Sequence, residues 1–397
     1  MKAGWKTRSL GELLLKTETV NPLSAPDDDF SYIDVSSVSN ETYEIEETQR
    51  LKGKDAPSRA RRLVKAGDVI FATIRPTLQR IARVPASLDG QVCSTGYFVM
   101  RPCPELDAQY LFYSLFTEQF MSGMESLQKG ASYPAVTDAE VRSQQISYPS
   151  LQEQRRIVTL LDEAFADIAI AKANAEKNLQ NARELFNSHL DAIVVHAQEN
   201  GEIVALSELA TDITDGDHMP PPKVEHGLPF ITIGNIDKQT RSIDFADTFK
   251  VPREYFDGLK ANKKPMRGDV LYTVTGSFGI PVLVEDDAEF CFQRHIGLIR
   301  PKADVDSTWL HYLLQSPQVF NQAADGATGT AQKTVSLKVL RNLQVPRIFP
   351  KDQLAHVETL RSVEAECRRL ESIYRQKLTA LDDLKKSLLH QAFSGQL

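Results

Sequence analysis

The stretch LDEAFADIAIAKANAEKNLQNAREL, residues 161–185, is matched by LRSVEAECRRLESIYRQKLTALDDL, residues 360–384. The apolar positions are Leu161, Ala164, Ile168, Ala171, Ala175, Ala182 and Leu185 in the first stretch and Leu360, Val363, Cys367, Leu370, Tyr374, Leu381 and Leu384 in the second. The two sets correspond at an offset of 199 residues, from 161 to 360. Spacings of three and four place each set on one side of a helix. Two such stripes in one chain predict a two-helix coiled coil.

The helices around these stripes are expected to be long, from Gln152 to Gln198 and from Asp352 to Phe393. About 40 residues at ~1.5 Å each span on the order of 60 Å, which exceeds the usual helix of a globular domain. A whole domain connects the helices, which permits an antiparallel, pseudo-two-fold arrangement. The alternative is that each helix packs on its own domain. The expected interface consists of Leu161, Ile168, Ala175, Leu185, Leu360, Cys367, Leu370, Leu381 and Leu384.

The rest of the chain is duplicated too. A short helical or turn segment opens each copy, three β-prone segments and a helix follow, and a glycine-led loop precedes the last apolar segment. The matching segments are 10–13 and 206–209, 32–35 and 230–233, 67–73 and 268–274, 99–102 and 298–301, 109–120 and 308–320, and 130–132 and 329–331. Because repeats of solenoid proteins are only about 20–50 residues long, this period indicates a duplicated domain with its helix.

The sequence therefore predicts an α+β protein with two tandem α/β domains. The first domain covers residues 1–150 and is followed by a central coiled-coil helix, 151–200. The second covers residues 201–348 and is followed by a C-terminal coiled-coil helix, 349–397. Two globular units joined to paired helices indicate a protein that binds a two-part target whose parts lie at a fixed distance from each other.

The amino-acid composition limits the classes of protein to which the chain can belong. The chain has 397 residues, 42% of them hydrophobic and 25% charged, as in a globular protein. It has no run of about 18 apolar residues and no apolar signal-like core at its start, so we expect no membrane span and a cytoplasmic location. The four cysteines show no CxxC spacing, which argues against a zinc site and a disulfide framework.

Charge is unevenly distributed along the first copy. The whole chain carries a net charge of −7. Residues 50–83 nevertheless contain ten basic and two acidic side chains, a net charge of +8, whereas residues 27–47 contain eight acidic side chains and no Lys or Arg. This segregation is compatible with a basic face for phosphates. The alternative is a solvated surface on which charges cluster by chance.

Several segments carry a family resemblance. Residues 130–136 (GASYPAV) and 146–158 (ISYPSLQEQRRIV) lie at the passage from domain to helix, and residues 384–395 (LKKSLLHQAFSG) lie at the end of the last helix. Residues 215–220 (DGDHMP) lie near the start of the second copy. In their order and duplication these segments resemble the specificity subunits of type I restriction-modification systems, and the resemblance covers essentially the whole chain.

The resemblance implies that each globular unit is a target recognition domain for one half of a bipartite, asymmetric double-stranded DNA sequence. The helices would set the spacing between the halves. Two methylation subunits would dock on the chain and methylate adenine with S-adenosylmethionine. Restriction subunits, which combine motor and nuclease, would cut DNA using ATP and Mg. The chain itself would be a non-catalytic subunit without a cofactor.

The motifs agree with a chain that carries no chemistry of its own. The sequence has no GxGxxG or GxxxxGK[ST] phosphate loop and no amino-methyltransferase motif. Asp215, Asp217 and His218 have residue types that bind metals, but an Asp-Gly turn that leads into a proline-rich loop is the favoured interpretation, so no metal site is expected. The rival class is a coiled-coil adaptor that binds proteins and never DNA.

Base reading requires polar and basic side chains presented from loops. Candidate loops align between the copies after the Gly-Asp strand, before the following strand, and before the last apolar segment. The expected DNA-binding residues are Arg75, Gln79, Arg80, Ser94, Thr95 and Lys129 in the first copy and Ser277, Arg294, His295 and Lys333 in the second. The alternative for each is an ordinary structural role in an exposed loop or hairpin turn.

Overall fold

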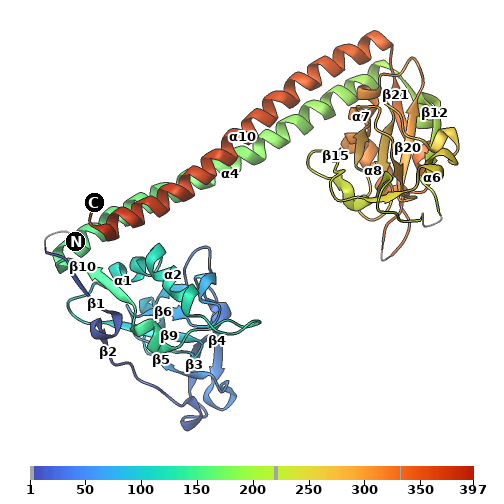
Figure 1. Cartoon of the computed structure of the whole chain (residues 1–397). Helices are drawn as coiled ribbons and strands as arrows, with labels where there is room; N and C mark the ends of the chain where they lie inside the picture. The colour runs from blue at the N-terminus through green and yellow to red at the C-terminus, as the bar shows by residue number, and fades with distance from the viewer. Residues whose placement is uncertain (1–3, 219–221, 331) are drawn as a thin grey trace. The chain divides into compact units, whose positions relative to one another are not determined.

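The computed structural model describes residues 4–218, 222–330 and 332–397. The chain falls into two compact units: unit 1 comprises residues 1–176 and 376–397, and unit 2 comprises residues 177–375. The long helices α4 (Leu151–Asn200) and α10 (Pro350–Ser394) are divided between the units. Each unit therefore contains a globular part, the first portion of one long helix and the last portion of the other (Figure 1).

The globular part of unit 1 contains two four-stranded sheets and one terminal strand pair. The first sheet has the order β2 (Leu14–Leu15), β9 (Tyr97–Pro102), β6 (Val69–Ala72), β7 (Ile81–Arg83), and the second has the order β4 (Gln49–Lys52), β3 (Asp29–Ile33), β8 (Val92–Ser94), β5 (Ala60–Leu63). β1 (Lys6–Ser9) pairs with β10 (Gln145–Tyr148). All pairings are antiparallel except that of β3 with β8.

Unit 2 repeats this topology, with three strands instead of four in the described part of its second sheet. Its first sheet has the order β12 (Ala210–Asp215), β20 (Ile296–Pro301), β17 (Val270–Thr273), β18 (Pro281–Leu283), and its second has the order β16 (Phe249–Val251), β13 (Leu228–Ile231), β19 (Cys291–Phe292). β14 (Ile236–Asp237) pairs with β15 (Ser242–Ile243), and β11 (Glu202–Ala205) pairs with β21 (Gln344–Arg347). The parallel pair β13 and β19 corresponds to β3 and β8 in unit 1.

The short helices also recur, with one departure from expectation. Unit 1 has α1 (Ala108–Ser114), α2 (Glu118–Leu127) and α3 (Asp138–Arg142), and unit 2 has α5 (Leu206–Leu209), α6 (Arg253–Asp257), α7 (Ser307–Gln315), α8 (Pro317–Gly326) and α9 (Leu337–Arg341). The continuous helices predicted over 109–120 and 308–320 are each broken in two. Thr117 and Ser316 take extended conformations, and each side chain accepts a hydrogen bond from the start of the next helix, as an N-cap does.

A buried ion pair fastens the central strands in each unit. The Asp68 carboxylate accepts hydrogen bonds of 2.8 Å from both Nε and Nη2 of Arg101. Asp269 accepts equivalent bonds of 2.9 and 2.8 Å from Arg300. The hydrogen bonds to Asp269 raise the pKa of the Arg300 guanidinium. The Gly-Asp turns predicted from sequence thus also supply one half of a structural ion pair.

A buried glutamine joins each domain to the first turns of its helix. The side chain of Gln154 accepts a hydrogen bond from the Asp107 backbone N–H (2.8 Å) and donates to the carbonyls of Glu105 (2.9 Å) and Pro149 (3.0 Å). Gln353 makes the same three contacts at the start of α10, with Asp306, Asp304 and Ile348. These contacts fix the direction in which each long helix leaves its domain.

We predict that Gln154→Leu destabilises unit 1, whereas Gln152→Leu does not. Gln154 is fully buried, so its replacement leaves one backbone donor and two carbonyls without their partner, at a cost of about 2–4 kcal/mol. Gln152 is exposed on the same helix turn and its replacement is expected to change the free energy of unfolding by less than ~0.5 kcal/mol. Urea unfolding measures both values, and equal effects would contradict this role of Gln154.

Within each unit the two long helices run antiparallel and pack on each other as well as on the domain. In unit 1, Lys172 forms an ion pair of 2.8 Å with Asp382. In unit 2, Arg183 pairs with Glu371 at 3.2 Å, and the rings of His196 and His356 lie 6.1 Å apart. In these three contacts the residue numbers increase along α4 while they decrease along α10, which shows that the helices are antiparallel. The two helices lie side by side in each unit (Figure 1). The alternative that each helix packs only on its own domain is therefore wrong.

The apolar stripes define the inner sides of the helices except at their ends. Leu161, Ile168, Ala175, Leu360 and Cys367 are buried, and Leu370 and Leu381 are half-buried. Leu185 and Leu384, by contrast, are 45% and 46% exposed. After Ala182 the next three buried positions of α4, Phe186, Leu190 and Val194, follow at steps of four, and the ring of Phe186 lies 6.1 Å from that of Tyr312. Because seven residues do not make a whole number of α-helical turns, a strict heptad pattern drifts around the helix. The last predicted position of each stripe therefore lies outside the interface.

No helix in the described part of the chain is both long and apolar enough to cross a membrane. The four cysteines, Cys93, Cys103, Cys291 and Cys367, are all free thiols.

Candidate nucleic-acid interface

Three loops of unit 1 that are distant in sequence meet at one end of β6 and β9. They are residues 73–80, 94–96 and 129–136. The Thr73 N–H donates to the Gly96 carbonyl (2.9 Å), and the Val136 N–H donates to the Thr73 carbonyl (2.9 Å). The Arg75 N–H donates to the Pro134 carbonyl at 2.6 Å. We call this arrangement the three-loop frame. It brings together all three loops that the sequence singled out in the first copy.

Unit 2 contains the same three-loop frame, formed by residues 274–279, 293–295 and 328–335, of which Ala331 lies outside the described residues. The Val274 N–H donates to the His295 carbonyl (2.9 Å), and the Val335 N–H donates to the Val274 carbonyl (2.8 Å). The Gly276 N–H donates to the Lys333 carbonyl (3.0 Å). The two frames share their backbone hydrogen bonds, whereas their side chains differ.

Only some of the predicted residues of unit 1 project freely from the frame. Arg75 and Thr95 are exposed, and the Lys129 side chain is 84% exposed while it forms an ion pair of 3.1 Å with Glu140. Ser94 is completely buried, and its hydroxyl accepts a hydrogen bond from the Gly96 N–H (3.2 Å). Ser94 therefore shapes the turn and, in this position, has no surface with which to contact DNA.

Arg80 has a structural environment. Its Nη1 donates to the carbonyls of Val35 (3.2 Å), Ser36 (3.4 Å) and Val38 (2.6 Å), so the guanidinium holds a neighbouring turn. Arg80 is half-buried and its Nη1 is engaged within the domain, so it has a structural role, and its contact with DNA stays a prediction. The sequence could not reveal this role because the three carbonyls lie more than 40 residues away.

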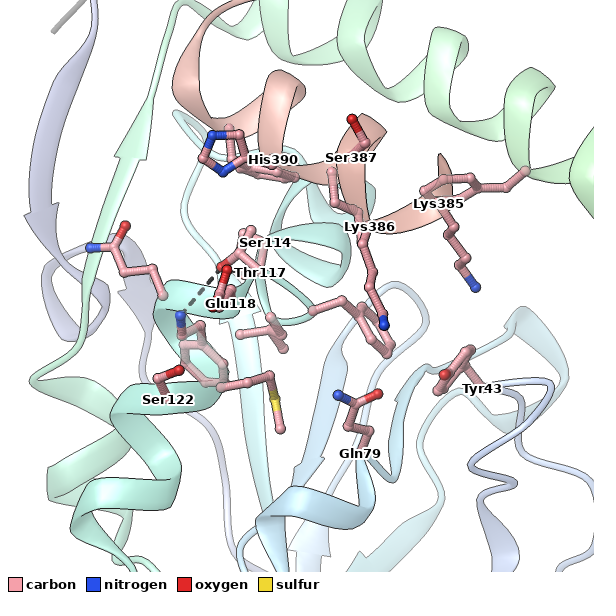
Figure 2. Close-up of a pocket in the computed structure, with 18 of the residues that line it drawn as sticks. Tyr43, Gln79, Ser114, Thr117, Glu118, Ser122, Lys385, Lys386, Ser387 and His390 are labelled. Carbon is pink, nitrogen blue, oxygen red and sulfur yellow. Dashed lines mark hydrogen bonds between the residues drawn. The ribbon is translucent and has the colours of Figure 1, made fainter. Parts of the chain in front are cut away.

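Gln79 faces a different region. It lines a groove of about 1650 Å³ between the globular part of unit 1 and its two helices, together with apolar side chains such as Phe165 and Phe393. Figure 2 shows Gln79 and Tyr43 at this groove opposite Lys385 of α10. The Lys385 ammonium lies 5.1 Å from the Tyr43 ring and 5.2 Å from the Phe165 ring, and burial lowers the pKa of Lys385.

In unit 2, Arg294 and Lys333 are exposed on the frame, and His295 and Ser277 are half-buried. Burial lowers the pKa of His295, and the charges of Arg294 and His218 lower it further. A neutral imidazole can both donate and accept a hydrogen bond. The Ser277 carbonyl accepts a hydrogen bond from the Thr273 hydroxyl (2.8 Å), which closes the turn.

The segment after β12 lies next to this frame, but two of its motif residues, Met219 and Pro220, lie outside the described residues. His218 Nε2 is 3.0 Å from Asp215 Oδ2, and Asp217 Oδ2 accepts a hydrogen bond from the Tyr255 hydroxyl (3.2 Å). A Cβ on Gly216 would lie 2.1 Å from the Phe292 carbonyl, so only glycine fits there. Among the described residues, no three His, Cys, Asp or Glu side chains are grouped to hold a metal ion.

The positive stretch at residues 50–83 is partly neutralised by the fold. Arg50 pairs with Asp29 at 3.3 Å, Arg62 with Asp138 at 2.8 Å and Lys65 with Glu18 at 3.5 Å. Together with the internal contacts of Arg80, these pairs use several of the ten cations within the domain. The net charge of this stretch therefore overstates the charge available to a nucleic acid.

We predict that Arg80→Ala lowers the free energy of unfolding by about 1–2 kcal/mol, because it removes charge-assisted hydrogen bonds to carbonyls. Arg75→Ala is expected to change it by less than ~0.5 kcal/mol, since the Arg75 side chain is exposed. Both variants lose one positive charge, so each is a control for the other. Equal stabilities in urea unfolding would show that Arg80 has no structural role.

Two exposed residues lie on the frames, Tyr133 and Gln332; the sequence indicates Gln332 as a candidate next to Lys333, whereas it gives no indication of Tyr133. They correspond to each other at the same offset of 199, three residues after Gly130 and Gly329. The aligned glycines were the available signal, because both have a positive φ, 107° and 109°.

The duplicated frames and the paired helices define a class of two-module proteins, and comparisons show which known proteins the chain is similar to. Residues 2–181 match the family model described as the type I restriction modification DNA specificity domain. The chain is 25% identical over 316 residues to the type I restriction enzyme MjaVIII specificity subunit of Methanocaldococcus jannaschii, covering 74% of this chain and 71% of the relative. It is 21% identical over 339 residues to the EcoBI specificity subunit of Escherichia coli, covering 79% and 70%.

Solved structures agree with these matches. A chain from a study of complex assembly and conformational transition of the type I restriction-modification system has a TM-score of 0.88 and 27% identity, covering 100% of this chain and 99% of that chain. The HsdS subunit from Thermoanaerobacter tengcongensis has a TM-score of 0.66 and 27% identity, with 100% and 98% covered. Together these findings show that the chain is similar to the specificity subunits of type I restriction-modification systems over essentially its whole length.

Proposed function

We propose that this chain selects the DNA on which a type I restriction-modification complex acts, and that each unit reads one half of a bipartite, asymmetric sequence. One observation carries this proposal: two three-loop frames with the same backbone hydrogen bonds present different side chains. A constant backbone frame with different side chains is what we expect of two domains that each recognise a different DNA sequence. Residues 1–150 and 201–348 are the two recognition domains in this proposal.

In unit 1 we assign contacts with DNA to Arg75, Thr95 and Lys129, which are exposed on the frame. In unit 2 we assign them to Arg294, His295 and Lys333. Arginine and lysine neutralise phosphates or read guanine in the major groove, while threonine and histidine hydrogen-bond base edges or backbone. Ser94 and Arg80 hydrogen-bond within the domain and support the loops. Gln79 lines the groove and Ser277 is half-buried, so we assign neither of them a main contact with DNA.

The long helices, residues 151–200 and 349–397, act as the spacer between the half-sites and as the docking surface for two methylation subunits. The spacer role is supported by the buried glutamines, Gln154 and Gln353, which tie each helix to its domain. A rigid attachment would transmit helix length and phase to the position of the recognition loops.

In this role the chain carries out no catalytic step. Transfer of a methyl group from S-adenosylmethionine to adenine belongs to the methylation subunits. ATP- and Mg-dependent cleavage belongs to the restriction subunits. This chain contributes binding, orientation and the choice of sequence.

The test is DNA binding by the complete chain with its methylation subunit, measured across a range of salt concentrations. We expect the logarithm of the binding constant to fall linearly with the logarithm of salt, with a slope of about −0.9 per phosphate neutralised. Mapping methylated adenines in cells that carry the complex should give one two-part motif. Binding that is weak and insensitive to salt, with no motif, would favour the rival protein adaptor.

An exchange of residues 1–150 with those of a relative tests independent reading. One half of the motif should change and the other should stay. A change in both halves would contradict the assignment of one half-site to each domain.

A further inference from the structure

In unit 1 an arginine and a tyrosine are stacked at the outer edge of the three-loop frame. The Arg75 guanidinium carbon lies 5.0 Å from the centre of the Tyr133 ring, and Nη2 donates to the Ser132 carbonyl at 3.4 Å. Tyr133 is 71% exposed, so most of its ring faces solvent. The contact with the ring and the hydrogen bond to Ser132 restrict the motion of the guanidinium, while the Arg75 side chain remains exposed to solvent.

In unit 2 a glycine and a glutamine occupy the same two places. Gly276 corresponds to Arg75, because each donates its N–H to the equivalent residue of the opposite loop. Gln332 corresponds to Tyr133 and is exposed. A Cβ on Gly276 would lie 2.9 Å from Nε2 of Gln332, so the glutamine side chain extends over the glycine. The two positions are thus in contact in both units.

The backbone around the two pairs is also shared. Arg75 has φ 51° and Gly276 has φ 71°, which is the left-handed region in both cases. A non-glycine residue in this conformation costs about 1–3 kcal/mol and persists where the surroundings enforce it. A bridge between Ile74 and Ala135 flanks the first pair, and one between Thr275 and Thr334 flanks the second. The frame therefore keeps the same shape while the chemistry at its edge changes.

We infer that these two contacting positions, Arg75 with Tyr133 and Gly276 with Gln332, form one base-reading element in each unit and that their identities determine which base is preferred. This inference rests on the proposed function. An arginine held against an aromatic ring matches the two acceptors of guanine, O6 and N7. A glutamine with no side chain beneath it matches the acceptor and donor of adenine, N7 and N6. The first half-site thus contains a guanine read by Arg75, and the second contains an adenine read by Gln332.

The experiment exchanges the pair of unit 1 for that of unit 2. The double variant Arg75→Gly/Tyr133→Gln is made in the complete chain, expressed with its methylation subunit, and methylated adenines are mapped by sequencing. One position of the first half-site should change from guanine to adenine, with discrimination of guanine reduced about five- to 100-fold, while the second half-site stays the same. Glycine adopts a positive φ without strain, so the variant should melt no lower than the wild type.

Arg50→Ala is the matched control, because it removes one positive charge from a side chain that is 79% exposed and lies outside the frame. It should leave the motif unchanged. The inference is overturned if the double variant keeps the wild-type motif, or if it loses all methylation at an unchanged melting temperature, since the pair would then supply affinity without selecting a base. A wild-type complex that gives no two-part motif would instead refute the proposed function itself.

Discussion

Matching insertions of four residues in the two long helices are expected to lengthen the gap between the half-sites and to leave the half-sites themselves unchanged. The insertions go after Asn178 in α4 and after Arg375 in α10. Each point lies between the ion pairs Lys172–Asp382 of unit 1 and Arg183–Glu371 of unit 2 along its helix. Four residues add about 6 Å and about 40° beyond a full turn.

A base pair rises about 3.4 Å, so the gap should grow by one or two base pairs. Methylation at the original gap should fall on the order of 100-fold, because a shift of several Å misplaces one half of the site. Mapping of methylated adenines measures both effects. Insertion in α4 alone is the control, since it puts the two stripes out of register and should weaken methylation at every gap. Full activity at the original gap after both insertions would show that the helices do not set the distance.

Arg300→Met is expected to destabilise unit 2 by about 3–5 kcal/mol, because it leaves a buried carboxylate without its counter-ion. The Asp269 side chain is only 1% exposed, and without Arg300 its hydrogen bond from the Met266 N–H (3.0 Å) remains. The methionine fills a similar volume, so lost packing is a minor part of the effect. Trp309 is buried in unit 2 and reports its unfolding by fluorescence in a Trp5→Phe background.

Arg347→Met is the matched control in the same unit. Its ion pairs with Glu202 and Glu208, both at 3.4 Å, are exposed, and such pairs contribute about 0–1 kcal/mol. The double variant Arg300→Met/Asp269→Asn should recover part of the lost stability, because it removes the unpaired charge. A loss of less than ~1 kcal/mol in Arg300→Met would show that the buried pair is not needed to hold the sheet.

The duplication and the paired helices follow from the order of residues alone. Apolar spacing is a local property that a helix converts directly into a stripe, so residues 161–185 and 360–384 predict two helices with matching inner sides. The repeat offset then predicts which strands and loops correspond. In the structure β6 corresponds to β17 and β9 corresponds to β20, as expected. The resemblance to type I specificity subunits is carried by the same duplicated segments.

The roles of individual side chains were decided by contacts between distant residues. Arg75 and Arg80 are five positions apart on one loop, yet one is exposed while the other donates to three carbonyls. Ser94 and Thr95 are neighbours, but one is buried and the other exposed. Residue type predicts which groups a side chain can form hydrogen bonds with. Only the folded structure determines which of those groups lie close enough to do so.

The same reason explains where the stripe ends and which residues form the edge of the frame. Leu185 has the right spacing, but the neighbouring Phe186 lies against Tyr312, because helix phase and the domain surface together select the inner side. Tyr133 meets Arg75 across 58 positions of sequence because the Arg75 N–H bonds the Pro134 carbonyl. Such pairings are set by long-range hydrogen bonds, for which the spacing of residues along the chain contains no signal.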